Sequence, residues 1–189
     1  MSNIHPLRHL FLGGARSGKS ALAEAAAHAW LQQFPKGQVV YVATAQVLDK
    51  EMQARVALHQ QRRPSSWLVL EEPMQLAQVL NSLPQKPQQP VCFLIDCLTL
   101  WLSNQLCQQV KVDADNVMLA EQAIDELLAC LAEHEGSVLL VSNEVGSGIV
   151  PMGELSRQFQ DLSGIMNQRL AQACERVTLA VAGLPMQLK

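Results

Sequence analysis

The chain has 189 residues, of which 49% are hydrophobic and 16% charged, and its formal net charge is -3. This length and hydrophobic content suit one core and a single domain over residues 1–189, and the lack of a basic excess argues against nucleic acid as a partner. No apolar run reaches the roughly 20 residues that a membrane span needs, and the five cysteines, odd in number and without a C-x-x-C pair, favour free thiols in a cytoplasmic, reducing compartment.

Short apolar segments alternate with longer helix-like segments along the chain. In chain order, we predict a strand at 9–12, a helix at 20–33, a strand at 38–46, a helix at 49–61, a strand at 91–95, a helix that opens at 101–104, a helix at 115–134, a strand at 137–143, a helix at 156–175 and a strand at 176–183. Several of these strands are continuous apolar runs, as in a parallel sheet that is covered on both faces. The alternation therefore predicts an α/β fold with a mainly parallel sheet flanked by helices.

The first predicted strand leads directly into GGARSGKS, which matches the phosphate-binding pattern G-x-x-x-x-G-K-S. Glycines let the backbone N–H groups of such a loop turn toward phosphate oxygens, and the following helix adds the partial positive charge of its N-terminus. We expect Lys19 to act on the outer phosphates as a catalytic cation and Ser20 to ligate Mg²⁺. The expected nucleotide contacts in this loop are Gly13, Gly14, Ala15, Arg16, Ser17, Gly18, Lys19 and Ser20. This context predicts a P-loop NTPase-like (RecA-like) fold.

Asp96 ends the apolar strand sequence CFLID. In a P-loop protein an acidic residue at such a strand end faces the metal ion next to the loop hydroxyl. Asp96 is therefore the second candidate ligand of Mg²⁺ and a candidate nucleotide contact. The alternative is an ordinary strand-end aspartate that caps the next turn.

The loop leaves open what becomes of the phosphates. The N-K-x-D motif that reads guanine in GTPase switches does not occur in the sequence. The arginine-rich lid of adenylate-type kinases is not evident either, because no arginine lies between Arg63 and Arg157. A nucleotidyl or phosphoryl transferase, a P-loop kinase for another small-molecule alcohol and a non-catalytic nucleotide-binding regulator all stay possible at this point.

The segment 49–64 combines a histidine with several charged residues. On a helix, Glu51, Arg55 and His59 share one face at spacings of four, and Arg62 and Arg63 follow at once. A histidine beside guanidinium groups is well placed near phosphate and can accept a phosphoryl or nucleotidyl group on a ring nitrogen. His59 is thus a candidate for covalent catalysis. From the residues alone, the alternative of a solvated histidine on a charged helix face stays open.

Five segments together resemble a known family, namely GGARSGKS, YVATAQVLDKEM-ARV--H---RP, DCLTLWLSN, VSNEVGSGIVP and FQDLSGIMNQRLA. In this order they are similar to the bifunctional adenosylcobinamide kinases/adenosylcobinamide-phosphate guanylyltransferases of cobalamin biosynthesis. The resemblance implies that ATP or GTP phosphorylates adenosylcobinamide, and that GTP then donates GMP to adenosylcobinamide phosphate. It also implies that the GMP passes through a histidine, which is His59 here, and that the enzyme is a homo-oligomer, a trimer.

The resemblance further implies a set of nucleotide contacts outside the loop. These are Ala43, Thr44, Ala45, Gln60, Gln61, Arg62, Arg63 and Glu71. Glu71 is the candidate for reading guanine, because a carboxylate can accept from both N1–H and the exocyclic amine of that base. The neighbouring Glu72 leaves the choice between the two open. No catalytic role is assigned to Asn143 or Glu144, and the corrinoid is expected in a groove between subunits.

Overall fold

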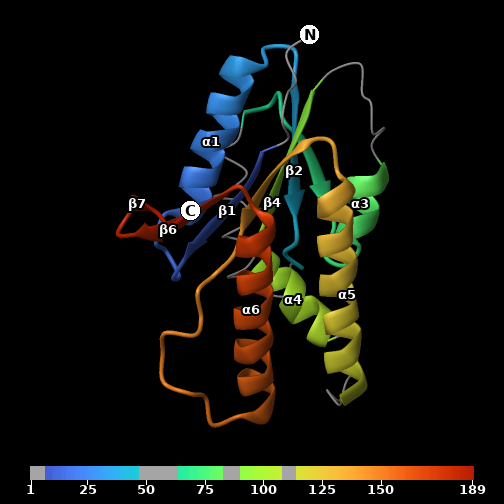
Figure 1. Ribbon diagram of the computed structural model, residues 1–189, viewed down its shortest axis with the longest axis vertical. Coiled ribbons are helices and arrows are strands. Elements are labelled where there is room, and N and C mark those ends of the chain that lie inside the picture. Colours follow the sequence, from blue (N-terminus) through green and yellow to red (C-terminus); the bar gives the residue numbers. More distant parts are fainter. Residues whose placement is uncertain (1–6, 47–63, 83–89, 108–113) are drawn as a thin grey trace.

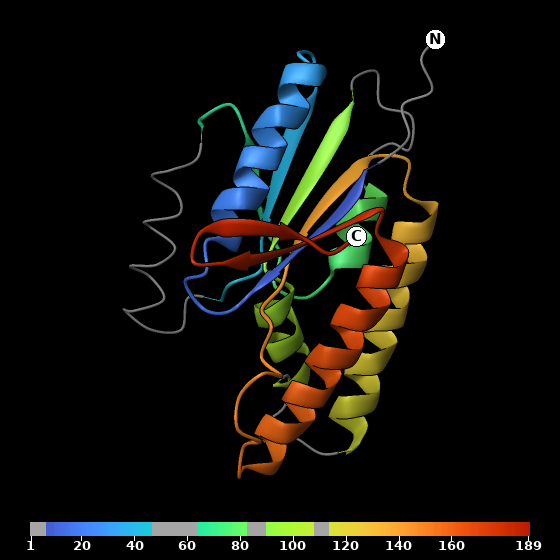
Figure 2. The ribbon, with the colours of Figure 1, turned by 60° about the vertical axis from the view of Figure 1, so that its left-hand side comes forward.

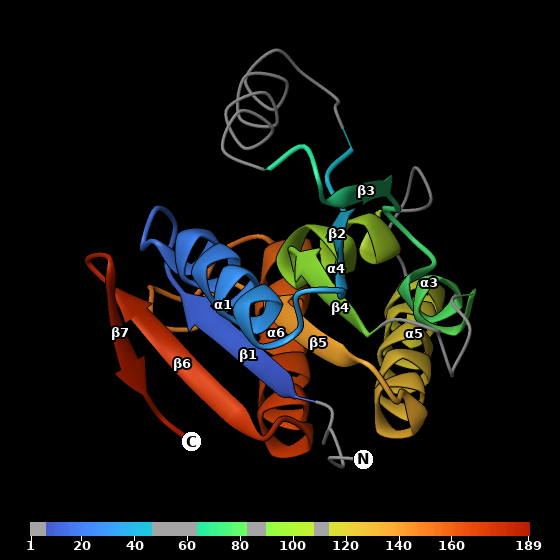
Figure 3. The same cartoon turned by 90° about the horizontal axis from the view of Figure 1, so that it is seen from above.

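The computed structural model describes residues 7–46, 64–82, 90–107 and 114–189. Its strands are β1 (Arg8–Gly13), β2 (Gln38–Ala43), β3 (Leu68–Glu71), β4 (Val91–Asp96), β5 (Ser137–Val141), β6 (Arg176–Val181) and β7 (Leu184–Gln187). They form a seven-stranded sheet (Figure 1) in the order β3-β2-β4-β5-β1-β6-β7, which can be followed by the strand labels in Figure 3. All neighbouring strands are parallel except β6 and β7, which are antiparallel. The predicted mainly parallel sheet is confirmed.

The helices of the described residues are α1 (Lys19–Gln33), α3 (Leu76–Ser82), α4 (Leu98–Leu106), α5 (Ala114–Glu133) and α6 (Glu154–Ala173). Alternate residues of each central strand point to opposite faces of the sheet. Phe11 and Leu94 pack with Trp30 of α1 on one face, whereas Leu10 and Phe93 pack with α3, α4, α5 and α6 on the other (Figure 3). Both faces are therefore covered, which explains the continuous apolar runs of the strands. Within the described part, no helix is long and apolar enough to cross a membrane.

Three elements have no counterpart in the sequence prediction, namely β3, α3 and β7. The strands β3 and β7 are the two edges of the sheet and have four residues each, largely exposed, so their apolar pattern is too short to stand out. Pro185 lies in β7, where an edge position tolerates the missing N–H. The strand predicted over 38–46 ends at Ala43. The helix predicted over 49–61 lies outside the described residues.

The cysteines are free thiols, as expected, and all except Cys107 are buried. Burial raises the pKa of Cys92 to about 12 and the pKa of Cys97 to about 11. These thiols therefore stay protonated at neutral pH and behave as small hydrophobic side chains.

His9 of β1 is a buried polar residue with an unusual proton affinity. Its ring stacks on Phe11, and its Nε2 lies 2.8 Å from the hydroxyl of Thr178 on β6. Burial, with a smaller contribution from the positive charge of Arg176, lowers the pKa of His9 from the ordinary 6.5 to about 4. The unfolded chain takes up a proton between these two pH values that the folded protein does not, so stability decreases as pH falls through this window.

We expect the wild-type protein to lose up to about 3 kcal/mol of unfolding free energy between about pH 7 and about pH 4 that His9→Phe does not lose. Phenylalanine keeps a ring against Phe11 and removes the titratable group. Urea denaturation over this pH range measures the difference. His28→Phe, on the exposed side of α1, should retain the wild-type pH dependence. The same pH dependence in wild type and His9→Phe would contradict the prediction.

Candidate active site

The glycine-rich loop joins the end of β1 to the start of α1. Gly18 caps the helix with a φ of 95°, in the left-handed region that favours glycine. The tip of the β6–β7 hairpin lies beside the loop (Figure 2), where the N–H of Gly183 donates to the carbonyl of Ser17 at 2.8 Å. A Cβ added to Gly18 would lie 3.0 Å from the Cα of Gly183. The hairpin, which the sequence did not reveal as part of the site, therefore supports the loop.

We expect Gly18→Ala to destabilise the protein by roughly 1–3 kcal/mol and to weaken nucleotide binding at least tenfold. An alanine there must adopt a left-handed conformation and also displace the hairpin backbone. Gly148→Ala is the matched control, because a Cβ at Gly148 meets no atom within 4 Å. Urea denaturation and titration with a fluorescent GTP analogue measure the two effects. Wild-type nucleotide affinity in Gly18→Ala would refute this account of the loop.

Lys19 and Asp96 lie at the carboxyl edge of the sheet, where their opposite charges interact. Lys19 opens α1 and is 8% exposed, and its Nζ donates to the carbonyl of Gly14 at 3.0 Å, so the ammonium lies over the loop. Burial lowers the pKa of Lys19 from its ordinary value, and the negative charge of Asp96 opposes this shift. Asp96 ends β4, two strand positions from β1, and accepts a hydrogen bond from the Tyr41 hydroxyl at 2.8 Å on Oδ2.

Ser20 and Asp96 are the side chains available to Mg²⁺ near the loop. Within the described ranges, no group of three or more His, Cys, Asp or Glu side chains could hold a metal ion. Mg²⁺ suits such a sparse set, because it commonly binds one or two protein oxygens together with water and substrate phosphates. Tyr41 engages one carboxylate oxygen of Asp96, which leaves the other for this purpose. The metal role of both residues stays a prediction.

Thr44, one of the nucleotide contacts that the resemblance implies, is held by hydrogen bonds within the protein. It has no exposed surface. Its hydroxyl donates to the carbonyl of Cys97 at 2.7 Å and accepts from the Cys97 N–H at 2.8 Å. Its own carbonyl accepts from Asn104 Nδ2 of α4 at 2.9 Å. Through these bonds Thr44 ties the end of β2 to the end of β4 and to α4, and its role as a nucleotide contact stays a prediction. Its neighbours Ala43 and Ala45 are half-buried.

The structure distinguishes Glu71 from Glu72. Glu72 Oε1 accepts from the N–H groups of Met74 and Gln75 at 2.9 and 2.8 Å and so caps the start of α3. Glu71 ends β3 with an exposed side chain, paired in register with Ala43. Since β3 lies four strand positions from β1, the two strands are about 19 Å apart across the sheet. Glu71 is the available carboxylate of the pair, and a guanine would have to extend along the carboxyl edge to reach it.

The segment after β5 lies between the loop and Asp96, and no catalytic role is expected for its residues. Asn143 donates its N–H to Thr99 Oγ1 at 2.6 Å, and Glu144 donates its N–H to the carbonyl of Gly13 at 3.1 Å. The side-chain oxygen of Asn143 is buried and has no hydrogen-bond partner within the part of the chain that the structure describes. Its position beside the P-loop could have been inferred from the strand that precedes it. His59, Gln60, Gln61, Arg62 and Arg63 lie outside the described residues.

The sheet, the loop between β1 and α1 and the acidic strand end define a P-loop NTPase-like nucleotide-binding protein. A solved structure described as an ATPase domain has the same fold, with a TM-score of 0.52 and 15% sequence identity over 92% of this chain and 68% of that chain. Residues 9–188 match the family model of cobinamide kinase / cobinamide phosphate guanyltransferase, and the chain belongs to this family.

Relatives support this assignment over nearly the whole chain. The bifunctional adenosylcobalamin biosynthesis protein CobP of Pseudomonas aeruginosa is 49% identical over 184 residues, covering 97% of this chain and 98% of the relative. The bifunctional adenosylcobalamin biosynthesis protein CobU of Escherichia coli is 38% identical over 187 residues, covering 95% of this chain and 98% of the relative. The family expected from the sequence motifs is thereby confirmed.

Proposed function

We propose that this protein phosphorylates adenosylcobinamide with ATP or GTP and then transfers GMP from GTP to the resulting phosphate. The observation that carries the proposal is a formed phosphate-binding loop, with Lys19 over it and Asp96 at the nearby strand end, in a chain of this family. The product would be adenosyl-GDP-cobinamide, with pyrophosphate released.

In the kinase step the loop N–H groups and Lys19 hold the triphosphate, and Ser20 and Asp96 would hold Mg²⁺. When bound, the ion would draw charge from the phosphate oxygens. The hydroxyl oxygen of the substrate arm forms a bond to the γ-phosphorus as the bond between that phosphorus and the β,γ-bridging oxygen breaks. The nucleoside diphosphate leaves and the hydroxyl proton is released. Lys19 stabilises the charge that develops on the leaving group.

In the transferase step a ring nitrogen of neutral His59 attacks the α-phosphorus of GTP, and pyrophosphate leaves. The phosphoramidate so formed carries GMP until an oxygen of adenosylcobinamide phosphate displaces the histidine. Arg62 and Arg63 would favour the neutral imidazole by charge repulsion and hold phosphate oxygens. Gln60 and Gln61 would add hydrogen bonds, and Glu71 would read the guanine.

We also propose a domain organisation, a cellular compartment and an oligomeric state for the enzyme. We expect one catalytic domain over residues 1–189, working in the cytoplasm, where its free thiols stay reduced. We also expect a homo-oligomer, a trimer. Ile149 and Met152 support an interface, because they are 96% and 97% exposed in the loop before α6 and an apolar loop of this kind is typical of a contact surface.

The proposal is tested by supplying adenosylcobinamide, Mg²⁺ and ATP labelled at the γ-phosphorus, and then GTP labelled at the α-phosphorus. We expect γ-label and then α-label in the corrinoid product, with turnover that depends on the corrinoid. Phosphorylation of another alcohol but not of adenosylcobinamide would indicate a kinase of different specificity. Nucleotide binding without turnover would indicate a regulator.

A further inference from the structure

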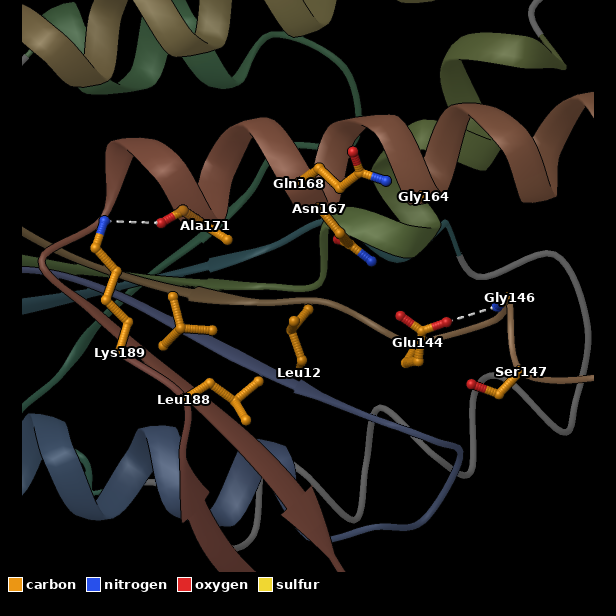
Figure 4. Close-up of a pocket in the computed structure, with 11 residues that line it drawn as sticks. Leu12, Glu144, Gly146, Ser147, Gly164, Asn167, Gln168, Ala171, Leu188 and Lys189 are labelled. Atoms are coloured by element: carbon orange, nitrogen blue, oxygen red, sulfur yellow. Dashed lines mark hydrogen bonds between the residues drawn. The ribbon is translucent and has the colours of Figure 1, made fainter.

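A groove of about 650 Å³ lies between α6, the sheet and the segment that follows β7 (Figure 4). Leu12 and Leu188 contribute to an apolar floor, and Asn167 and Gln168 of α6 add carboxamide groups. One end of the groove reaches Glu144 (Figure 4). Small-molecule sites typically have this size and this mixture of an apolar surface with a few polar groups.

Asn167 indicates what kind of ligand the groove suits. Its side chain is 5% exposed and projects from α6 toward Leu12 (Figure 4). Its Nδ2 donates to the carbonyl of Asn143 at 3.0 Å, which fixes the orientation of the amide. Its Oδ1 is buried and has no hydrogen-bond partner among the residues that the structure describes. A buried amide oxygen without a partner is destabilising, so a ligand N–H that bonded to it would be bound favourably.

The groove is connected to the phosphate-binding loop at its Glu144 end. The N–H of Glu144 donates to the carbonyl of Gly13, the first residue of the loop, at 3.1 Å. Glu144 Oε1 accepts from the N–H of Gly146 at 2.7 Å, which holds the carboxylate at this end (Figure 4). The loop continues into α1 on one face of the sheet, and the groove lies on the α6 face. A ligand in the groove therefore approaches the loop from the side opposite to α1.

We propose that this groove, which lies within a single chain and not between subunits as the sequence analysis expects, holds the corrinoid body of the phosphoryl acceptor. The inference rests on the proposed function, which requires an acceptor site beside the loop and separate from the nucleotide. The macrocycle would lie on the apolar floor, its carboxamide side chains would bond Asn167 and Gln168, and its aminopropanol arm would pass Glu144 toward the loop. A corrinoid is flat, largely apolar across its ring and bordered by amides, and the groove presents the complementary groups.

Equilibrium dialysis of adenosylcobinamide against the full-length protein tests the groove without relying on catalysis. Gln168→Trp places a bulky ring on the groove wall. Gln172→Trp is its matched control, since Gln172 is exposed one turn further along α6 and does not line the groove. Ala171→Phe, which narrows the groove from within, forms a second pair with the exposed Ala173→Phe. Thermal unfolding and GTP affinity establish that each variant is folded.

We expect Gln168→Trp and Ala171→Phe to raise the Kd for adenosylcobinamide at least about tenfold, with GTP affinity within about twofold of wild type. Both controls should bind adenosylcobinamide as wild type does. Unchanged binding in both groove variants would overturn the assignment of the groove as the corrinoid site. The proposed function would stay intact if phosphorylation persists. If the groove variants specifically lose binding but the wild type does not phosphorylate adenosylcobinamide, the groove assignment stands and the proposed function fails. Absence of binding to the wild type would overturn the assignment of this ligand.

Discussion

Lys19→Met is expected to lower kcat/KM for phosphorylation of adenosylcobinamide about 100- to 1,000-fold. Methionine has a similar length but carries no charge, so the loop keeps its backbone N–H groups and loses the ammonium that lies over it. The loss should appear in both reactions, because both discharge a phosphate leaving group at the same loop. Initial rates with γ-labelled ATP and with α-labelled GTP measure the two steps.

Lys36→Met is the control for this substitution, since Lys36 is exposed in the turn after α1. It should retain wild-type rates in both steps. A decrease of less than about tenfold in Lys19→Met would show that the ammonium is not a main source of charge stabilisation. A loss confined to one step would show that the two reactions use different phosphate sites.

His59→Ala is expected to abolish guanylyl transfer and to leave the kinase step within about fivefold of wild type. The histidine is needed as the GMP carrier, whereas the substrate hydroxyl attacks the γ-phosphorus directly. With α-labelled GTP, Mg²⁺ and no acceptor, wild-type protein should acquire a label that is labile in acid and stable in base, as a phosphoramidate is. The variant should acquire none.

His28→Ala serves as the control, because His28 is an exposed histidine of α1 outside the loop. It should be labelled like wild type and turn over in both steps. A label of wild-type extent in His59→Ala would exclude His59 as the carrier. Loss of both activities together would instead indicate that His59 helps to bind nucleotide in each step.

The loop and the family could be predicted from the sequence because their determinants are contiguous. The residues Gly13–Ser20 specify their own strand, turn and helix start, and glycine at position 18 is required by the left-handed backbone observed there. Asp96 was likewise recognisable, since a carboxylate directly after an apolar strand must lie at the carboxyl edge of a parallel sheet.

The features of the site that could not be predicted depend on contacts between distant segments. Thr44 follows a strand, and its bonds to Cys97 and Asn104 are contacts that no local pattern encodes. The roles of Glu71 and Glu72 could be told apart only in the structure, because Glu72 caps α3, a helix that the sequence did not reveal. The groove likewise combines residues from α6, the sheet and the segment after β7.

The bond between Gly183 and Ser17 also has a consequence for biosynthesis of the protein. The strand β1 pairs with β5 and β6, and the loop that follows it is supported by the β6–β7 turn. A ribosome makes the loop early, but its structural support is translated more than 160 residues later. Contacts between segments this far apart in the sequence carry a large loop-closure cost, and this one cannot form before residue 183 has been synthesised. Nascent chains that stop short of residue 183 should therefore carry the complete loop sequence and still fail to retain nucleotide.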